Sequence, residues 1–133
     1  MSPDRVILDV DAGVDDALGL VLALISPELT IEAITAVNGN VSVDMSIKNV
    51  LRVLSLFPNN KNVTVYRGEA SPLVKKPFNA SNVHGNDGLG DLGDDYYPPL
   101  NWDLVSNKPA PALMAELIEN HPGEITIIAT GPM

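Results

Sequence analysis

Short runs of β-branched and apolar residues alternate along the chain with segments whose apolar residues recur every three or four positions. The first pattern predicts strands, and the second predicts helices that bury one side. We expect strands at residues 6–11, 31–37, 63–66 and 124–129, and helices at 15–26, 43–57 and 110–120. Strands that alternate with helices form parallel βαβ units with right-handed crossovers. The sequence therefore predicts an α/β fold: an open, mainly parallel, Rossmann-like sheet with helices on both faces, truncated after the fourth strand.

The composition is that of one soluble domain, and it disfavours several classes of function. The chain has 133 residues, of which 45% are hydrophobic and 19% charged, so a core can form. A net charge of -9 argues against nucleic-acid binding, and the lack of cysteine excludes disulfides and thiolate metal sites. The longest apolar run, 17–25, is shorter than the roughly 20 residues that span a membrane, and no signal peptide is evident. We predict a cytoplasmic protein that binds neither nucleic acid nor membrane.

The turn after the first strand is rich in carboxylates: Asp9, Asp11, Asp15 and Asp16 lie within eight residues. Asp9 and Asp11 are two positions apart, so on a strand they would point to the same side. The turn is at the carboxyl end of the strand, where open α/β sheets bind ligands. Carboxylates this close repel one another, and a hard divalent cation such as calcium or magnesium would relieve that cost. Alternatively, Asp15 and Asp16 cap the helix, and Asp9 binds neighbouring backbone amides.

Residues 68–108 show little periodicity, and a loop of that length in a compact domain is usually functional or disordered. Its centre, 84–90, has the sequence HGNDGLG. Asp87 and the glycines beside it are residues that set turn geometry. We therefore expect this part of the loop to have a defined structure.

Four segments resemble, in order, motifs of the inosine-uridine preferring nucleoside hydrolase family. Residues 7–17 resemble its opening signature D-x-D-x-G-x-D-D-A, and residues 37–41 resemble its G-N turn. Residues 84–90 resemble its H-G-x-D-G-L-G loop, and residues 129–132 resemble the start of its T-G-P segment. One such motif is weak evidence, but four in order are strong. Family members are more than twice this length, so residues 1–133 would be the N-terminal part of a single domain.

The resemblance implies hydrolysis of the N-glycosidic bond of ribonucleosides to ribose and free base, with calcium as cofactor. Asp11 and Asp16 would ligate the metal through their carboxylates, and Thr130 through its backbone carbonyl. Asp11 would also be the catalytic base that takes a proton from the attacking water. The first and fourth strands would be neighbours, which would bring Thr130 next to Asp11.

The resemblance also implies a set of residues around the substrate. Asp15 would bind ribose hydroxyls, and Asn40 would add a polar contact in the same pocket. Asp9 would hold the neighbouring site residues in place rather than contact the metal or substrate itself. His84 would contact the substrate at the mouth of the active site, to which loop 68–108 would contribute. The alternative for His84 is a loop histidine that fixes local structure.

Three further consequences follow from the resemblance. Family members commonly form dimers or tetramers, so a homo-oligomer is expected. One calcium ligand and the acid that protonates the leaving base would lie outside this chain. The chain would therefore carry only part of the active site and have little activity alone.

Three alternatives remain open at this point. Asp9-Val10-Asp11 resembles the D-x-D motif of haloacid-dehalogenase-like phosphatases, although that family has threonine or valine where this chain has Gly13. A receiver-like or other cation-binding module would place a phosphoacceptor aspartate after the third strand, and none follows 63–66. An inactive remnant of a hydrolase would keep the same residues.

Overall fold

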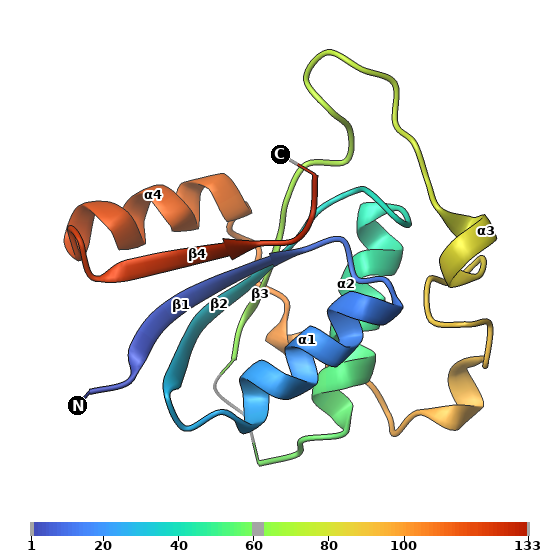
Figure 1. Cartoon of the computed structure of the whole chain (residues 1–133), viewed down its shortest axis with the longest axis horizontal. Helices are drawn as coiled ribbons and strands as arrows, with labels where there is room; N and C mark the ends of the chain where they lie inside the picture. The colour runs from blue at the N-terminus through green and yellow to red at the C-terminus, as the bar shows by residue number, and fades with distance from the viewer. Residues whose placement is uncertain (1, 60–62, 133) are drawn as a thin grey trace.

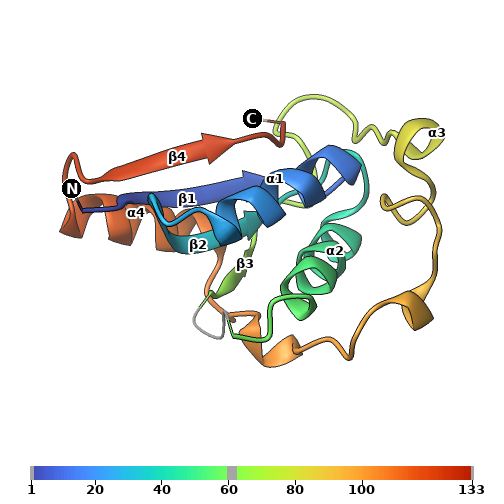
Figure 2. The same ribbon diagram turned by 60° about the horizontal axis from the view of Figure 1, so that its bottom comes forward.

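The computed structural model describes residues 2–59 and 63–132. Within this part of the chain, four strands form a wholly parallel sheet in the order β3-β2-β1-β4. The strands are β1 (Asp4–Val10), β2 (Leu29–Ala36), β3 (Val65–Arg67) and β4 (Ile125–Ala129). Helices α1 (Val14–Ile25) and α2 (Val43–Ser55) cover one face, and α4 (Ala110–Asn120) covers the other (Figure 1, Figure 2). The predicted α/β fold with helices on both faces is confirmed.

The elements agree with the predicted ranges to within about two residues at most ends, which is the usual uncertainty of such boundaries. One difference matters for the site: β1 ends at Val10, so Asp11 lies in the turn rather than on the strand. The loop 68–108 is also partly ordered into short helical turns. These are α3 (Ser81–His84), η1 (Asp94–Tyr96) and η2 (Trp102–Leu104).

The core has two parts because β1 is buried on both faces. Val6, Leu8 and Val10 pack towards α1 and α2. Ile7 points the other way and packs with Ala33 of β2 and Leu113 of α4. Each fully buried aliphatic side chain of this kind contributes about 1.5–3 kcal/mol of transfer free energy. The two cores therefore hold the carboxyl end of β1 in a fixed position.

Helix α1 is apolar nearly all round, but in the described part of the chain it is buried on one side only. Leu18 and Leu22 of α1 are 68% and 65% exposed, and Ile127 of the edge strand β4 is 43% exposed. An apolar helix is buried all round only where elements pack on every side. Here the sheet and α2 contact one side of α1. In the described residues, the outer side of α1 and the edge strand β4 are exposed to solvent. In the described ranges, no helix is long and apolar enough to cross a membrane.

Candidate active site at the acid turn

The turn between β1 and α1, residues 11–16, is named the acid turn here. Ala12 in this turn is buried and has a φ of 35°, a left-handed conformation that costs an alanine about 1–2 kcal/mol. The Ala12 carbonyl accepts a hydrogen bond from Asn49 Nδ2 of α2 at 3.0 Å. Backbone strain of this kind persists only where the surroundings hold it. The acid turn is therefore a conformation fixed by its neighbours.

The acid turn brings two buried carboxylates together. Asp11 and Asp16 are only 7% and 5% exposed, and Asp16 Oδ2 accepts the Asp11 amide at 3.1 Å. Asp11 Oδ2 in turn accepts the Asn40 amide at 2.9 Å. A Cβ on Gly39 would lie 2.2 Å from Asp11 Oδ2, so glycine is required for this approach. The two segments 11–16 and 37–41 thus form one site.

The environment of Asp16 favours its neutral form. Burial raises its pKa to about 6, helped by a hydrogen bond with Asp11 and by the negative charges of Asp11 and Asp15, while the Thr130 side chain opposes the shift. Burial likewise raises the pKa of Asp9, against a hydrogen bond from the Thr35 hydroxyl at 2.5 Å. The site therefore holds more negative charge than its surroundings neutralise.

We expect this charge to appear as a pH dependence of stability. Because the pKa of Asp16 is raised to about 6 in the folded state, its contribution to the free energy of unfolding is fully present below about pH 4 and is lost as pH rises to about 6. Between about pH 4 and about pH 7, the free energy of unfolding should fall by about 2–3 kcal/mol more than in the Asp16→Asn variant. Urea unfolding of both proteins at the two pH values measures this difference. Equal pH dependence in the two proteins would contradict the prediction.

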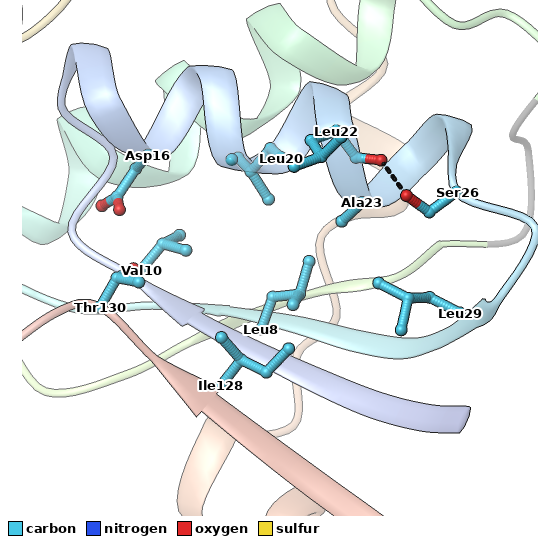
Figure 3. Close-up of a pocket in the computed structure, with 11 residues that line it drawn as sticks. Leu8, Val10, Asp16, Leu20, Leu22, Ala23, Ser26, Leu29, Ile128 and Thr130 are labelled. Carbon is cyan, nitrogen blue, oxygen red and sulfur yellow. Dashed lines mark hydrogen bonds between the residues drawn. The ribbon is translucent and has the colours of Figure 1, made fainter.

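Thr130 follows β4 and lies beside the acid turn. The expected adjacency of the first and fourth strands is confirmed, because β1 pairs with β4 in parallel. The Thr130 amide donates to the Asp9 carbonyl at 2.9 Å. Asp16 and Thr130 lie at one end of a groove of about 230 Å³ between α1 and the sheet, whose walls include Leu8, Leu20 and Ile128 (Figure 3).

The remaining candidates converge over Gly13. A Cβ on Gly13 would lie 2.6 Å from Asn40 Nδ2 and 2.8 Å from His84 Nδ1. His84 Nδ1 accepts the Val14 amide at 3.2 Å, and it is 4.0 Å from a carboxylate oxygen of the exposed Asp15. The loop around 84–90 therefore does reach the acid turn. The Val14 contact also fits a histidine that fixes local structure, so its role in substrate binding stays a prediction.

The donors at this site are oxygen atoms, which suit a hard cation. Within residues 2–59 and 63–132, no group of three or more acidic, histidine or cysteine side chains is arranged to hold a metal ion. The donor set offered by this chain is therefore the carboxylates of Asp11 and Asp16, with Thr130 nearby. The burial of Asp11 and Asp16, which raises the pKa of Asp16, is a cost that a bound cation would offset.

Sequence reasoning missed one group of residues behind the acid turn. Asn49 and Arg52 of α2 are 1% and 2% exposed, and they connect the acid turn to Asp87 in the 84–90 loop. The spacing of three positions shows only that Asn49 and Arg52 share one side of α2, and nothing in the sequence shows that this side is buried. Asp87 and its glycines do set a turn, as expected: Asp87 Oδ1 accepts the Leu89 amide at 2.8 Å, and Gly88 has a φ of 82°.

Comparison with known proteins agrees with this arrangement. The family model described as inosine-uridine preferring nucleoside hydrolase matches residues 6–133. The pyrimidine-specific ribonucleoside hydrolase RihA of Salmonella newport is 40% identical over 129 residues, which are 96% of this chain and 39% of the relative. The chain therefore spans about two fifths of that relative.

Solved structures give the same result. The purine-preferring ribonucleoside hydrolase from Gardnerella vaginalis matches with a TM-score of 0.85 and 28% identity, over 97% of this chain and 40% of that protein. The plant nucleoside hydrolase PpNRh1 matches with a TM-score of 0.80 and 37% identity, over 98% and 40%. These matches leave the phosphatase and receiver-like alternatives without support. The chain belongs to the inosine-uridine preferring nucleoside hydrolase family.

Proposed function

We propose that this chain forms the ribose-binding and water-activating part of an enzyme that hydrolyses ribonucleosides to ribose and free base. The observation that carries the proposal is the buried pair Asp11 and Asp16, with Asn40 and His84 beside it. A pair of carboxylates that share one buried site at the carboxyl end of a strand suits proton transfer and cation binding.

Asp11 is the general base in this proposal. Its Oδ2 already accepts the Asn40 amide, so the proton of the attacking water would go to Oδ1. The hydrogen bond from Asn40 and the glycine at position 39 fix the direction of the carboxylate. A fixed base aimed at one water contributes more to catalysis than a mobile one.

A calcium ion is the cofactor that we propose, held by the carboxylates of Asp11 and Asp16 and by the Thr130 carbonyl. When bound, such a cation supplies Lewis-acid activation of water. A cation would also offset the burial and the neighbouring negative charges that raise the pKa of Asp16. Asp9 would support this set: its carbonyl accepts the Thr130 amide, and its own carboxylate is held by Thr35.

Asp15, Asn40 and His84 would bind the sugar. Because His84 Nδ1 accepts the Val14 amide, the neutral ring carries its proton on Nε2, which can donate to a hydroxyl. Relatives named for pyrimidine and for purine preference both match this same part of the chain. We infer that this part recognises what their substrates share, namely ribose.

The remaining active-site groups are one calcium ligand and the acid that protonates the leaving base. We propose that they come from polypeptide that covers α1 and β4. Leu22 of α1 and Ile128 of β4 line the Asp16–Thr130 groove and are 65% and 39% exposed. Strand β4 is an edge of the described sheet, and an open edge strand pairs readily with another strand. We propose that residues 1–133 are the front part of one hydrolase domain, that loop 68–108 contributes to the mouth of its site, and that the assembled protein is a cytoplasmic homo-oligomer.

A chimera tests the proposed function. Residues 1–132 of this chain are joined to the part of Salmonella newport RihA that follows the matched segment, and release of free base from uridine, cytidine and inosine is measured. We expect the chimera to be at least about a hundredfold more active than the 133-residue chain, because it would add the acid and the calcium ligand that the proposal places outside residues 1–133. Activity should disappear with EDTA and return with calcium. A cooperatively folded chimera that hydrolyses none of the three would overturn the proposal.

A further inference from the structure

Helix α2 carries a stripe of polar residues that is fully buried. Ser46, Asn49 and Arg52 lie three positions apart on one side of the helix and are 0%, 1% and 2% exposed. Burial of polar side chains is unfavourable unless each one is hydrogen bonded. The partners of this stripe therefore indicate what it holds in place.

Asn49 uses both ends of its side-chain amide. Its Nδ2 donates to the Ala12 carbonyl at 3.0 Å and to the Asp87 carbonyl at 2.7 Å. Its Oδ1 accepts from Arg52 Nη1 at 2.9 Å. One amide group thus joins the strained residue of the acid turn to the loop around 84–90, two segments far apart in the sequence.

Arg52 orients the Asn49 side chain and also binds two aspartates of loop 68–108. Its Nη1 also donates to Asp87 at 3.0 Å, and its Nη2 donates to Asp94 at 2.6 Å. The guanidinium lies 4.9 Å from the centre of the Tyr97 ring. Burial alone would lower the pKa of Arg52, but the two aspartates raise it above its ordinary value, so the group remains charged. Among the described residues, Arg52 Nε is a buried nitrogen that has no hydrogen-bond partner.

We propose that Asn49 is a positioning residue that sets the acid turn relative to the 84–90 loop. Through Ala12 it holds the backbone next to Asp11, and through Asp87 it holds the loop that carries His84. Asn49 thereby fixes the position of Asp11, the proposed base, relative to His84, the proposed sugar-binding residue. Arg52 holds the Asn49 amide in one orientation. The catalytic meaning of this link rests on the proposed function, but the link itself does not.

The variant Asn49→Asp tests the link. Aspartate has the same shape and can still accept from Arg52, but it cannot donate to the Ala12 and Asp87 carbonyls. We measure hydrogen exchange at the amides of Asp11 and Asn40, which bind the two carboxylates of the site. Exchange at both should be about tenfold faster than in the parent chain, because the turn loses a bond to a buried acceptor. The Ile34 amide, which donates to Thr64 inside the sheet, should be unchanged.

The comparison among these amides separates positioning from general stability. A uniform acceleration that includes Ile34 would mean that Asn49 only stabilises the fold, and it would overturn the proposal. Unchanged exchange at Asp11 and Asn40 would also overturn it. The variant Lys48→Gln is the matched control. Lys48 is the partly exposed neighbour of Asn49, and of the residues that bind Asn49 or Arg52 it contacts only Asp94. It should leave all three amides as in the parent.

One further measurement, made on the parent chain, completes the test. In the parent chain, the Asn49 side-chain amide should exchange more slowly than those of the exposed Asn79 and Asn101. Equal exchange would overturn the proposal even if Asn49→Asp fails to fold. If the exchange results hold while the chimera hydrolyses no nucleoside, the proposed function fails and the positioning role stands.

Discussion

In the chimera, Asp11→Asn is expected to lower kcat for uridine about a thousandfold, within the range that loss of a general base produces. Asparagine has nearly the same shape, and its side-chain oxygen can still accept the Asn40 amide. The geometry of the turn should therefore persist, while the side chain can no longer take a proton. Steady-state kcat and KM for uridine, measured with saturating calcium, give the result. A fall in kcat with a smaller change in KM identifies the lost step as chemistry.

Asp4→Asn is the matched control for this measurement. Asp4 begins β1 at the end opposite the acid turn, and it is exposed. Its replacement removes the same charge from the same strand, so kcat should stay within about twofold of the parent chimera, as for most surface substitutions. Asp11→Asn with kcat within about tenfold of the parent would exclude Asp11 as the base.

The fold was predictable because its signals are local. Periods of two and of three to four residues separate strands from helices, and the alternation of these elements predicts a parallel sheet. The burial of α1 was not predictable in this way. Periodicity shows that Leu18 and Leu22 are apolar, but it does not show which neighbours are present to cover them.

The site was partly predictable. The acids of the acid turn are adjacent in sequence, so Asp11 and Asp16 could be expected to converge. The arrangement of their carboxylates could not be predicted. It depends on β1 ending at Val10, one residue before Asp11, and on the hydrogen bond from the Asn40 amide to Asp11. The approach of His84 could be expected only from the resemblance, since 70 residues separate it from Val14.

Asn49 and Arg52 were missed for a different physical reason. A polar residue on an amphipathic helix is normally expected on the solvent side. Both residues are instead covered by the loop that contains Asp87 and Asp94, and that loop shows no periodicity. When an irregular loop covers one side of a helix, the sequence has no periodic pattern that shows this side to be buried.

The largest expected loss of stability follows from Arg52→Met. Methionine can replace the aliphatic stem, but Asp87 and the Asn49 oxygen lose their buried partner. Removal of one member of a buried ion pair is strongly destabilising, whereas the exposed partner Asp94 adds little. We expect the free energy of unfolding in urea, at neutral pH, to fall by about 3 kcal/mol. This loss should be accompanied by faster exchange of the Leu89 amide, which Asp87 holds.

Two comparisons decide whether the buried partner is the cause. Lys48→Met removes a partly exposed cation that binds only Asp94 within this network, so it should cost less than about 1 kcal/mol. Asp87→Asn should cost less in the Arg52→Met background than alone, because the charge it removes is then already unpaired. Equal losses for Arg52→Met and Lys48→Met, or strict additivity with Asp87→Asn, would show that the Arg52–Asp87 pair does not hold the loop against α2.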